Sequence, residues 1–174
     1  MALSLWNGIK GRLGAGGIAF VVIMVLALGF IAANLLSDAR RPPVDLSVGS
    51  RFPCTVLSVY DGDGPINCAE VDARGQQVIV RLRGIEAREN DNSCRREDIC
   101  PPLSGAQGRA VLEELAGARM LCTSFGPSYN RVDSRCHTPG GVDISCEMIR
   151  RGAAMRWPEY DREGSLANCA PPRR

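Results

Sequence analysis

The stretch VRLRGIEARE, residues 80–89, gathers opposed charges at what the pattern predicts to be the end of a β-strand. In an extended chain Val80 and Leu82 share one face, and Arg81 and Arg83 share the other. Two carboxylates and a third arginine follow within the next few positions. Carboxylates bind hard cations or accept protons, and arginines grip anionic oxygens. The segment is therefore either part of a chemical site or a solvated strand end neutralised by salt bridges.

Three predicted strands joined by two turns lead into this segment, and the third strand contains its first residues. PCTVLSVY (53–60) has the β-branched content of a strand, and the Asp and Gly residues of DGDG (61–64) indicate a turn. PINCAEV (65–71) returns as a second strand, and ARGQ (73–76) turns the chain into QVIVRLR (77–83). Strands joined by such short turns form an antiparallel meander.

An irregular, charged loop at 86–102 separates the meander from the best helix of the sequence. Ser104 is the predicted N-cap, because Gln107 stands three residues later in the capping-box pattern. Apolar residues then recur at helical spacing, and Gly117 weakens the last turn.

The remaining elements are two strands at 119–125 and 131–137 and a short helix at 146–152, which follows Ser145 and stops at Gly152. Short antiparallel strands with a helix between the third and the fourth favour a barrel over a parallel sheet. We therefore expect a mainly β, α+β domain: a five-stranded OB-type barrel with two or three helices.

The N-terminus has the features of a membrane anchor. Residues 13–36 carry no charge and are long enough to span a bilayer, and two basic residues precede them. The prediction is a cytoplasmic segment at 1–12, one transmembrane helix at 13–36 in the inner membrane, a linker at 37–50 and an exported domain at 51–174. A long signal peptide, cleaved to release a secreted protein, is the alternative.

All eight cysteines lie beyond the apolar segment, which predicts a disulfide framework in an oxidising compartment. A zinc site is disfavoured because the sequence has no C-x-x-C pair and only one histidine, His137. Cys54 with Cys68, and Cys122 with Cys136, are the expected pairs, since each would join adjacent strands. Spacing leaves the pairing of the other four open.

The charge of the exported part is close to neutral. The formal charge of the chain is +2, and every basic residue except Lys10 is arginine. From residue 44 onward the sequence has 17 Arg and 18 Asp plus Glu. No basic field therefore gathers nucleic acid from a distance, and a polyanion would have to be held by a few local arginines.

Four segments in order carry a resemblance to a known family. VYDGDGPI (59–66), VRLRGIEARE (80–89), YNRV (129–132) and DISCEMIRRGAA (143–154) together resemble the staphylococcal-nuclease-like, or thermonuclease, family. That family shows a D-G-D-T turn, an R-L-x-G-I-D-A-P-E strand end, a Y-G-R segment and V-N-x-x-L-V-x-x-G-x-A. The resemblance covers roughly Thr55–Trp157. It implies an OB-type barrel that cleaves DNA and RNA phosphodiesters with Ca²⁺.

The resemblance implies a metal site made of oxygen ligands. Asp63 matches the first calcium carboxylate, and Glu86 stands where the family has a second acidic ligand. The backbone carbonyl of Ala87 would complete the protein ligands, and Asp61 matches a carboxylate that acts through water. Carboxylate and carbonyl oxygens are the ligands that calcium, a hard cation, takes.

The resemblance also implies three catalytic residues. Glu89 matches the general base, and Arg81 and Arg131 match the two arginines that clamp the phosphate. Arg135 is a weaker substitute for Arg131. The family's proline is replaced by Arg88, whose cation could pair with a neighbouring glutamate.

Other residues near these motifs are expected to be structural. Gly64 replaces the family's threonine without removing a ligand. Arg83, Arg95 and Arg96 are expected to be solvated, and Trp157 to pack against the barrel.

Two classes of function follow. The first is a calcium-dependent nuclease, acting as a monomer on DNA or RNA. The second is a catalytically silent OB-fold module that binds nucleic acid, a glycan or an envelope protein. A secreted inhibitor or purely structural disulfide domain is a third, less favoured reading.

Overall fold

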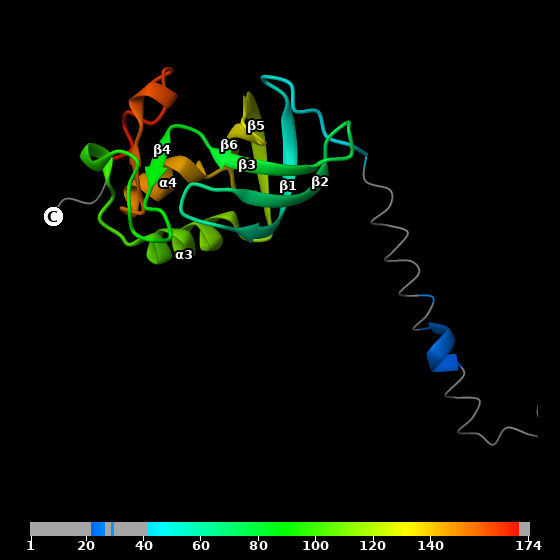
Figure 1. Cartoon of the computed structure of the whole chain (residues 1–174). Helices are drawn as coiled ribbons and strands as arrows, with labels where there is room; N and C mark the ends of the chain where they lie inside the picture. Colours follow the sequence, from blue (N-terminus) through cyan, green and yellow to red (C-terminus); the bar gives the residue numbers. More distant parts are fainter. Residues whose placement is uncertain (1–21, 27–28, 30–41, 171–174) are drawn as a thin grey trace, which may run out of the picture. The chain divides into compact units, whose positions relative to one another are not determined.

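The computed structural model describes residues 22–26, 29 and 42–170 (Figure 1). The chain divides into two units, Met1–Pro42 and Pro43–Arg174. The second unit contains all of the elements that position the candidate site.

The predicted cytoplasmic segment 1–12 and most of the predicted membrane helix 13–36 lie outside the described residues. Within that span residues 22–26 are α-helical. Among the described residues, no helix combines the length and the apolar character that crossing a bilayer requires.

The second unit begins before the predicted boundary at residue 51. Val44 donates its backbone N–H to the carbonyl of Val71 at 2.9 Å, and Val44 and Leu46 pack against the core. Residues 43–50 are thus part of the folded unit.

Five strands close into a barrel in the order β1–β2–β3–β6–β5 (Figure 1). β3 and β6 are parallel, and the other neighbouring strands are antiparallel. This OB-like arrangement confirms the predicted mainly β fold with a five-stranded barrel. The barrel strands are β1 (Arg51–Val59), β2 (Ile66–Val71), β3 (Gln77–Leu82), β5 (Arg119–Ser128) and β6 (Arg131–His137).

Alternation along β3 directs Arg81 out of the barrel. Val78, Val80 and Leu82 are buried, so the residues between them point away from the core. This is the pattern predicted for the end of the strand.

Sequence reasoning missed two three-residue strands, β4 (Ile85–Ala87) and β7 (Ala154–Arg156), which pair antiparallel as a separate sheet. All three residues of β4 are buried, so β4 offers no alternation to recognise. The predicted irregular loop at 86–102 therefore begins with a strand, and this strand carries Glu86 into the interior.

Helix α3 (Gly105–Ala116) has the predicted start. The Ser104 hydroxyl accepts a hydrogen bond from the Gln107 backbone, and the Gln107 side chain accepts one from the Ser104 backbone. This reciprocal pair confirms the capping box.

Helix α4 (Ile144–Arg150) begins two residues earlier than predicted. Asp143 is its N-cap and accepts a hydrogen bond from the Cys146 N–H at 3.0 Å. The predicted cap, Ser145, is buried inside the helix and donates to the carbonyl of Arg83 at 3.2 Å. Two single-turn 3₁₀ segments, Glu97–Ile99 and Pro158–Tyr160, complete the described structure.

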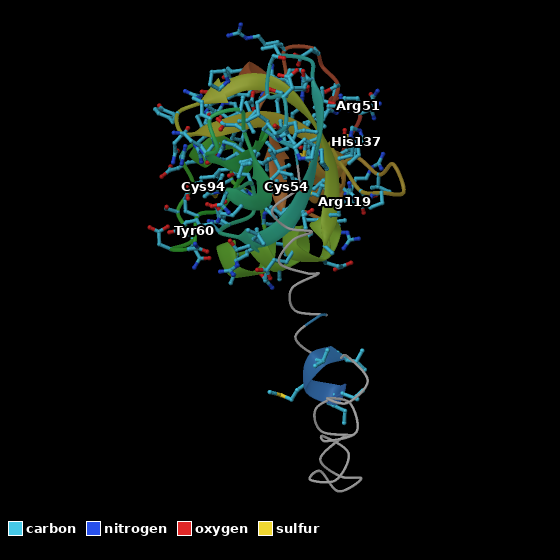
Figure 2. All side chains as sticks on the ribbon, turned by 90° about the vertical axis from the view of Figure 1, so that its right-hand side faces the viewer. Arg51, Cys54, Tyr60, Cys94, Arg119 and His137 are labelled. Carbon is cyan, nitrogen blue, oxygen red and sulfur yellow. A yellow bond between two sulfur atoms is a disulfide. The ribbon has the colours of Figure 1, made fainter. Side chains whose placement is uncertain are left out.

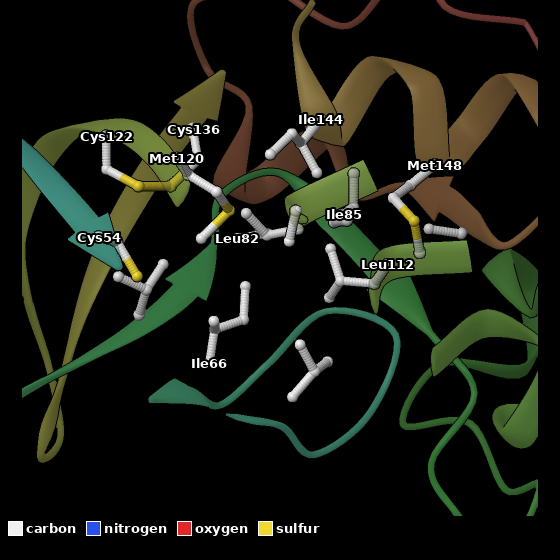
Figure 3. Packing of buried hydrophobic residues seen from close by; sticks show 14 of the residues in the cluster. Cys54, Ile66, Leu82, Ile85, Leu112, Met120, Cys122, Cys136, Ile144 and Met148 are labelled. Carbon is white, nitrogen blue, oxygen red and sulfur yellow. A yellow bond between two sulfur atoms is a disulfide. The ribbon is translucent and has the colours of Figure 1, made fainter. Parts of the chain in front are cut away.

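The core lies inside the barrel and extends under both helices (Figure 3). Two disulfides line it. Cys54–Cys68 joins β1 to β2, and Cys122–Cys136 joins β5 to β6, as predicted from strand adjacency. The two remaining pairs, which spacing left open, are Cys94–Cys100 and Cys146–Cys169.

The structure offers no support for a zinc site among the described residues. His137 lies at the end of β6, and its Nε2 is 3.9 Å from the carboxylate of Asp143 (Figure 2). Among the described residues, the only cluster with metal-ligand spacing is Cys54, Cys68 and Glu70. Its two sulfurs are bonded to each other, so they cannot act as thiolate ligands.

Removing the Cys146–Cys169 bridge should destabilise the domain. The bridge ties α4 to the C-terminal segment across 23 residues, and a loop of that size constrains the unfolded chain. We expect the double variant Cys146→Ser, Cys169→Ser to lose about 3 kcal/mol of unfolding free energy. Urea denaturation of the oxidised proteins measures this. An unchanged midpoint would mean that the segment is held by its other contacts, such as the Arg156–Asp161 ion pair.

Candidate active site

Four of the predicted site residues, Asp63, Arg81, Glu86 and Ala87, are in direct contact. Arg81 on β3 forms a two-point ion pair with Asp63 of the β1–β2 turn, with N–O distances of 2.7 and 2.9 Å. Its Nη2 also lies 3.7 Å from Oε2 of Glu86 on β4. The backbone N–H of Ala87 donates to Asp63 at 3.2 Å. The turn, β3 and β4 thus bring residues from three segments to one point.

Gly64 lets the β1–β2 turn sit directly on β3. Its φ is +112°, and a Cβ there would lie 2.7 Å from the carbonyl of Val80. On the other side of the same turn, the Leu82 N–H donates to the Asp63 carbonyl at 2.9 Å. The backbone therefore requires a glycine at position 64.

The acidic side of the site is buried and short of positive charge. Burial raises the pKa of Asp61 to about 7, with a further increase from the charge of Asp63. Burial raises the pKa of Asp63 to about 6 even though Arg81 opposes it, and burial also raises the pKa of Glu86. Oε2 of Glu86 is buried without a hydrogen-bond partner among the described residues. Such a site favours a bound cation or proton.

Glu89 is paired with Arg95 rather than with Arg88. Nε of Arg95 lies 3.0 Å from Oε1 of Glu89, and the Arg95 backbone N–H donates to Oε1 of Glu86 at 2.9 Å. Arg88 instead donates to the carbonyls of Pro101 and Asn92 at 2.9 and 2.8 Å. The Arg88 cation is thus turned toward the loop. Arg95 is solvent-exposed, as expected, and in addition pairs with Glu89.

Arg131, at the start of β6, lines the same pocket as Arg81 and Arg95. Its Nε is buried without a hydrogen-bond partner among the described residues. Burial lowers its pKa, and the positive charges of Arg81 and Arg95 lower it further. Arg135, the weaker substitute, is paired with Asp143 at 2.6 Å. Arg131 is therefore the better placed of the two to bind an anion beside Arg81.

Arg83 is not the solvated residue that was expected. It pairs with Asp133 and, at 3.1 Å, with Glu163, and its guanidinium lies 4.4 Å above the ring of Phe125. Arg83 thereby connects the barrel to the C-terminal segment.

A pocket of about 650 Å³ opens beside these residues. Trp157 forms part of its wall, with its ring 4.8 Å from that of Tyr160 in an edge-on arrangement. Arginines and aromatic rings dominate the lining: Arg81, Arg83, Arg95, Arg96, Arg131, Arg162, Phe125, Tyr129, Trp157 and Tyr160. Of the described residues that line it, two are acidic, Asp133 and Glu159. The pocket therefore suits an anion that also carries a flat ring.

The carboxylates of the site are of the type that binds calcium, but in this structure their oxygens are too far apart to bind one ion together. Asp61, Asp63, Glu86 and Glu89 offer only hard oxygen donors, and one Glu86 oxygen has no hydrogen-bond partner in the described part of the chain. Within the described ranges, however, no three of these carboxylates bring ligand atoms within 4.8 Å of one another. The Arg81 guanidinium contacts both Asp63 and Glu86. A cation would bind here only after Arg81 releases Asp63.

Substituting Gly105 should disturb the backbone of Glu89. A Cβ on Gly105, the first residue of α3, would overlap the Glu89 carbonyl oxygen. We expect Gly105→Ala to lower the unfolding free energy by about 2 kcal/mol, because backbone must move. Gly140→Ala is the matched control: its Cβ meets only the Thr138 hydroxyl at 3.7 Å, so its effect should be below about 0.5 kcal/mol. Equal losses in urea denaturation would contradict the close approach.

A scan against models of protein families and a search of curated proteins found no match to this chain. Membership of the thermonuclease family therefore remains a resemblance carried by four sequence segments.

Proposed function

We propose that this protein is a calcium-dependent nuclease that hydrolyses phosphodiester bonds in DNA or RNA. The observation that carries the proposal is the contact of Arg81 with both Asp63 and Glu86, beside a pocket that also contains Arg131. These residues come from three separate segments of the thermonuclease-like pattern, 59–66, 80–89 and 129–132. Several carboxylates buried around one guanidinium raise the free energy of the folded state, so stability alone is a poor reason for them.

The basic side of the site suits a phosphodiester. Arg81 and Arg131 would donate hydrogen bonds to the non-bridging oxygens, with the fork geometry that guanidinium offers to phosphate. These bonds tighten as negative charge builds on the five-coordinate phosphorus. Among the residues that the structure describes, Nε of Arg131 has no hydrogen-bond partner, which supports this role.

Glu89 would supply the base. It takes a proton from water as the water oxygen bonds to phosphorus and the bond to the leaving oxygen breaks; the leaving oxygen then takes a proton from solvent. Calcium, held by Asp63, Glu86, the Ala87 carbonyl and, through water, Asp61, would neutralise charge on the phosphate.

Arg81 links phosphate binding to release of the carboxylates. In the structure its two terminal nitrogens hold both oxygens of Asp63. When these nitrogens turn to a phosphate, Asp63 is left free to bind a cation. Cation and phosphate should therefore bind together more tightly than either binds alone.

The decisive experiment is a cleavage assay on the full-length, oxidised protein. Plasmid DNA and a structured RNA are incubated with calcium, and separately with a chelator. Calcium-dependent cleavage of either polymer supports the proposal, and absence of cleavage at every calcium concentration rejects it. Calorimetry with a nucleoside 3′,5′-bisphosphate then tests whether calcium and phosphate binding are coupled.

A binding module without catalytic activity is the second candidate. It is favoured because two of the predicted site carboxylates already form ion pairs with arginines. Arg81 forms an ion pair with Asp63, and Arg95 forms one with Glu89. If these pairs persist, the pocket would bind an oligonucleotide, a glycan or an envelope protein without a metal. Nucleotide binding that is unaffected by calcium, without cleavage, would favour this candidate.

We further propose that the domain is exported and acts as a monomer attached to the inner membrane through residues 13–36. The four disulfides support an oxidising compartment. An anchored chain should remain in the membrane fraction after an alkaline wash. Recovery in the medium would instead support the cleaved-signal alternative.

A further inference from the structure

A short disulfide-closed loop places Arg95 at the candidate site. Cys94 and Cys100 are bonded across only six positions, and the 3₁₀ turn Glu97–Ile99 lies inside the loop. Figure 2 shows Cys94 on the same side of the domain as Tyr60, which lies next to the DGDG turn. The hydrogen bond from Asn90 to the Tyr60 carbonyl, 3.1 Å, agrees with this.

Arg95 is joined to two of the predicted site carboxylates at once. Its backbone N–H donates to Glu86 at 2.9 Å, and its Nε lies 3.0 Å from Glu89. The first bond fixes the backbone of the loop against β4, and the second directs the side chain along the site. A surface arginine that only neutralised charge would not need the backbone attachment.

The end of the Arg95 side chain is still available. The side chain is 51% exposed and lines the pocket with Arg81 and Arg131. Among the described residues its two terminal nitrogens have no hydrogen-bond partner. Its neighbour Arg96 is different, because it pairs with both Asp98 and Glu159. Three guanidinium groups, of Arg81, Arg95 and Arg131, therefore face one cavity, and their mutual repulsion is relieved by a bound anion.

We propose that Arg95 is a third phosphate-binding residue, which exchanges Glu89 for a phosphate oxygen of the substrate and is held in place by the Cys94–Cys100 disulfide. The inference rests on the proposed function and deepens it: the substrate is a phosphodiester polymer gripped by three arginines. The exchange also frees the Glu89 carboxylate when substrate arrives.

The test measures binding without catalysis. The full-length oxidised protein is titrated with a nucleoside 3′,5′-bisphosphate in chelator, where no cleavage occurs. Arg95→Ala should weaken binding at least about 10-fold, as expected for loss of a charged hydrogen bond, and Arg95→Lys should recover part of it. Arg109→Ala is the matched control: Arg109 makes a similar ion pair with Glu113, 2.9 Å, outside the pocket. It should bind like the wild type.

The role of the disulfide is tested in a double-mutant cycle. Cys94→Ser with Cys100→Ser should weaken binding in the wild-type background and have little further effect when Arg95 is alanine. Equal weakening in both backgrounds would mean that the disulfide acts on the fold and not through Arg95.

The outcomes separate this inference from the proposed function. Unchanged binding by Arg95→Ala, with calcium-dependent cleavage intact, overturns the inference alone. Arg95-dependent binding without cleavage supports the inference and rejects the nuclease. A wild-type protein that binds no bisphosphate overturns the role of Arg95.

Discussion

Replacing Glu89 with glutamine should lower the rate of nucleic acid cleavage by about 10³-fold, because general-base catalysis contributes factors of this size. The fold should be little affected. The Glu89 side chain is 30% exposed and its ion pair with Arg95 is at the surface, so its loss should change stability by less than about 1 kcal/mol. Single-turnover cleavage with saturating calcium measures the chemical step directly.

Glu113→Gln provides the control for this variant. Glu113 also pairs with an arginine, Arg109, but lies on the exposed face of α3. Its variant should cleave at the wild-type rate. If Glu89→Gln also cleaves at that rate, Glu89 is not the base.

Replacing Arg81 with alanine should have two large effects. Cleavage should fall by at least about 10²-fold, because a donor to the transition-state phosphate is lost. The unfolding free energy at pH 8 should fall by about 3 kcal/mol, since the side chains of Arg81 and Asp63 are only 12% and 6% exposed and the carboxylate is left unpaired. Urea denaturation in chelator measures the second effect without any contribution from bound metal.

The loss of stability in Arg81→Ala should shrink at pH 5. The pKa of Asp63 is raised to about 6 in the folded protein, above its ordinary value of 3.8. At a pH between these two pKa values, folding is therefore accompanied by the uptake of a proton. The unfolding free energy then decreases as the pH rises from about 4 to 6. Without Arg81 the pKa of Asp63 rises further, so the decrease continues to higher pH. At pH 5 Asp63 is mostly protonated in both folded proteins.

Arg74→Ala is the control for this pH dependence, because the Arg74 side chain is 81% exposed and pairs only at the surface with Asp72. It should leave stability within about 0.5 kcal/mol at both pH values. A loss in Arg81→Ala that is the same at pH 5 and pH 8 would show that Asp63 is not the group left unpaired.

Local patterns in the sequence were sufficient for most of the barrel. Alternation placed Val80 and Leu82 inside and Arg81 outside, and the capping box located the start of α3. Strand adjacency also identified two of the disulfides, Cys54–Cys68 and Cys122–Cys136. These features depend on neighbours along the chain or on consecutive strands, so short segments contain the information.

The positions of β4 and β7 could not be predicted in the same way. Each has only three residues, and their pairing joins Ile85 to Arg156, which lie far apart in the sequence. The burial of Glu86 follows from this pairing. A charged residue beside a turn indicates exposure unless the partner strand is known.

The sequence alone determined which residue types are present and that Asp63, Arg81 and Glu86 follow ordered, spaced motifs. Only the tertiary structure decided which cation each carboxylate contacts: Arg81 holds Asp63, and Arg95, rather than the adjacent Arg88, holds Glu89. The reason is geometric. The direction of a long side chain depends on the path of its loop, and the Cys94–Cys100 link and the carbonyls of Pro101 and Asn92 set that path through contacts inside an irregular loop, which has no periodic pattern to reveal them.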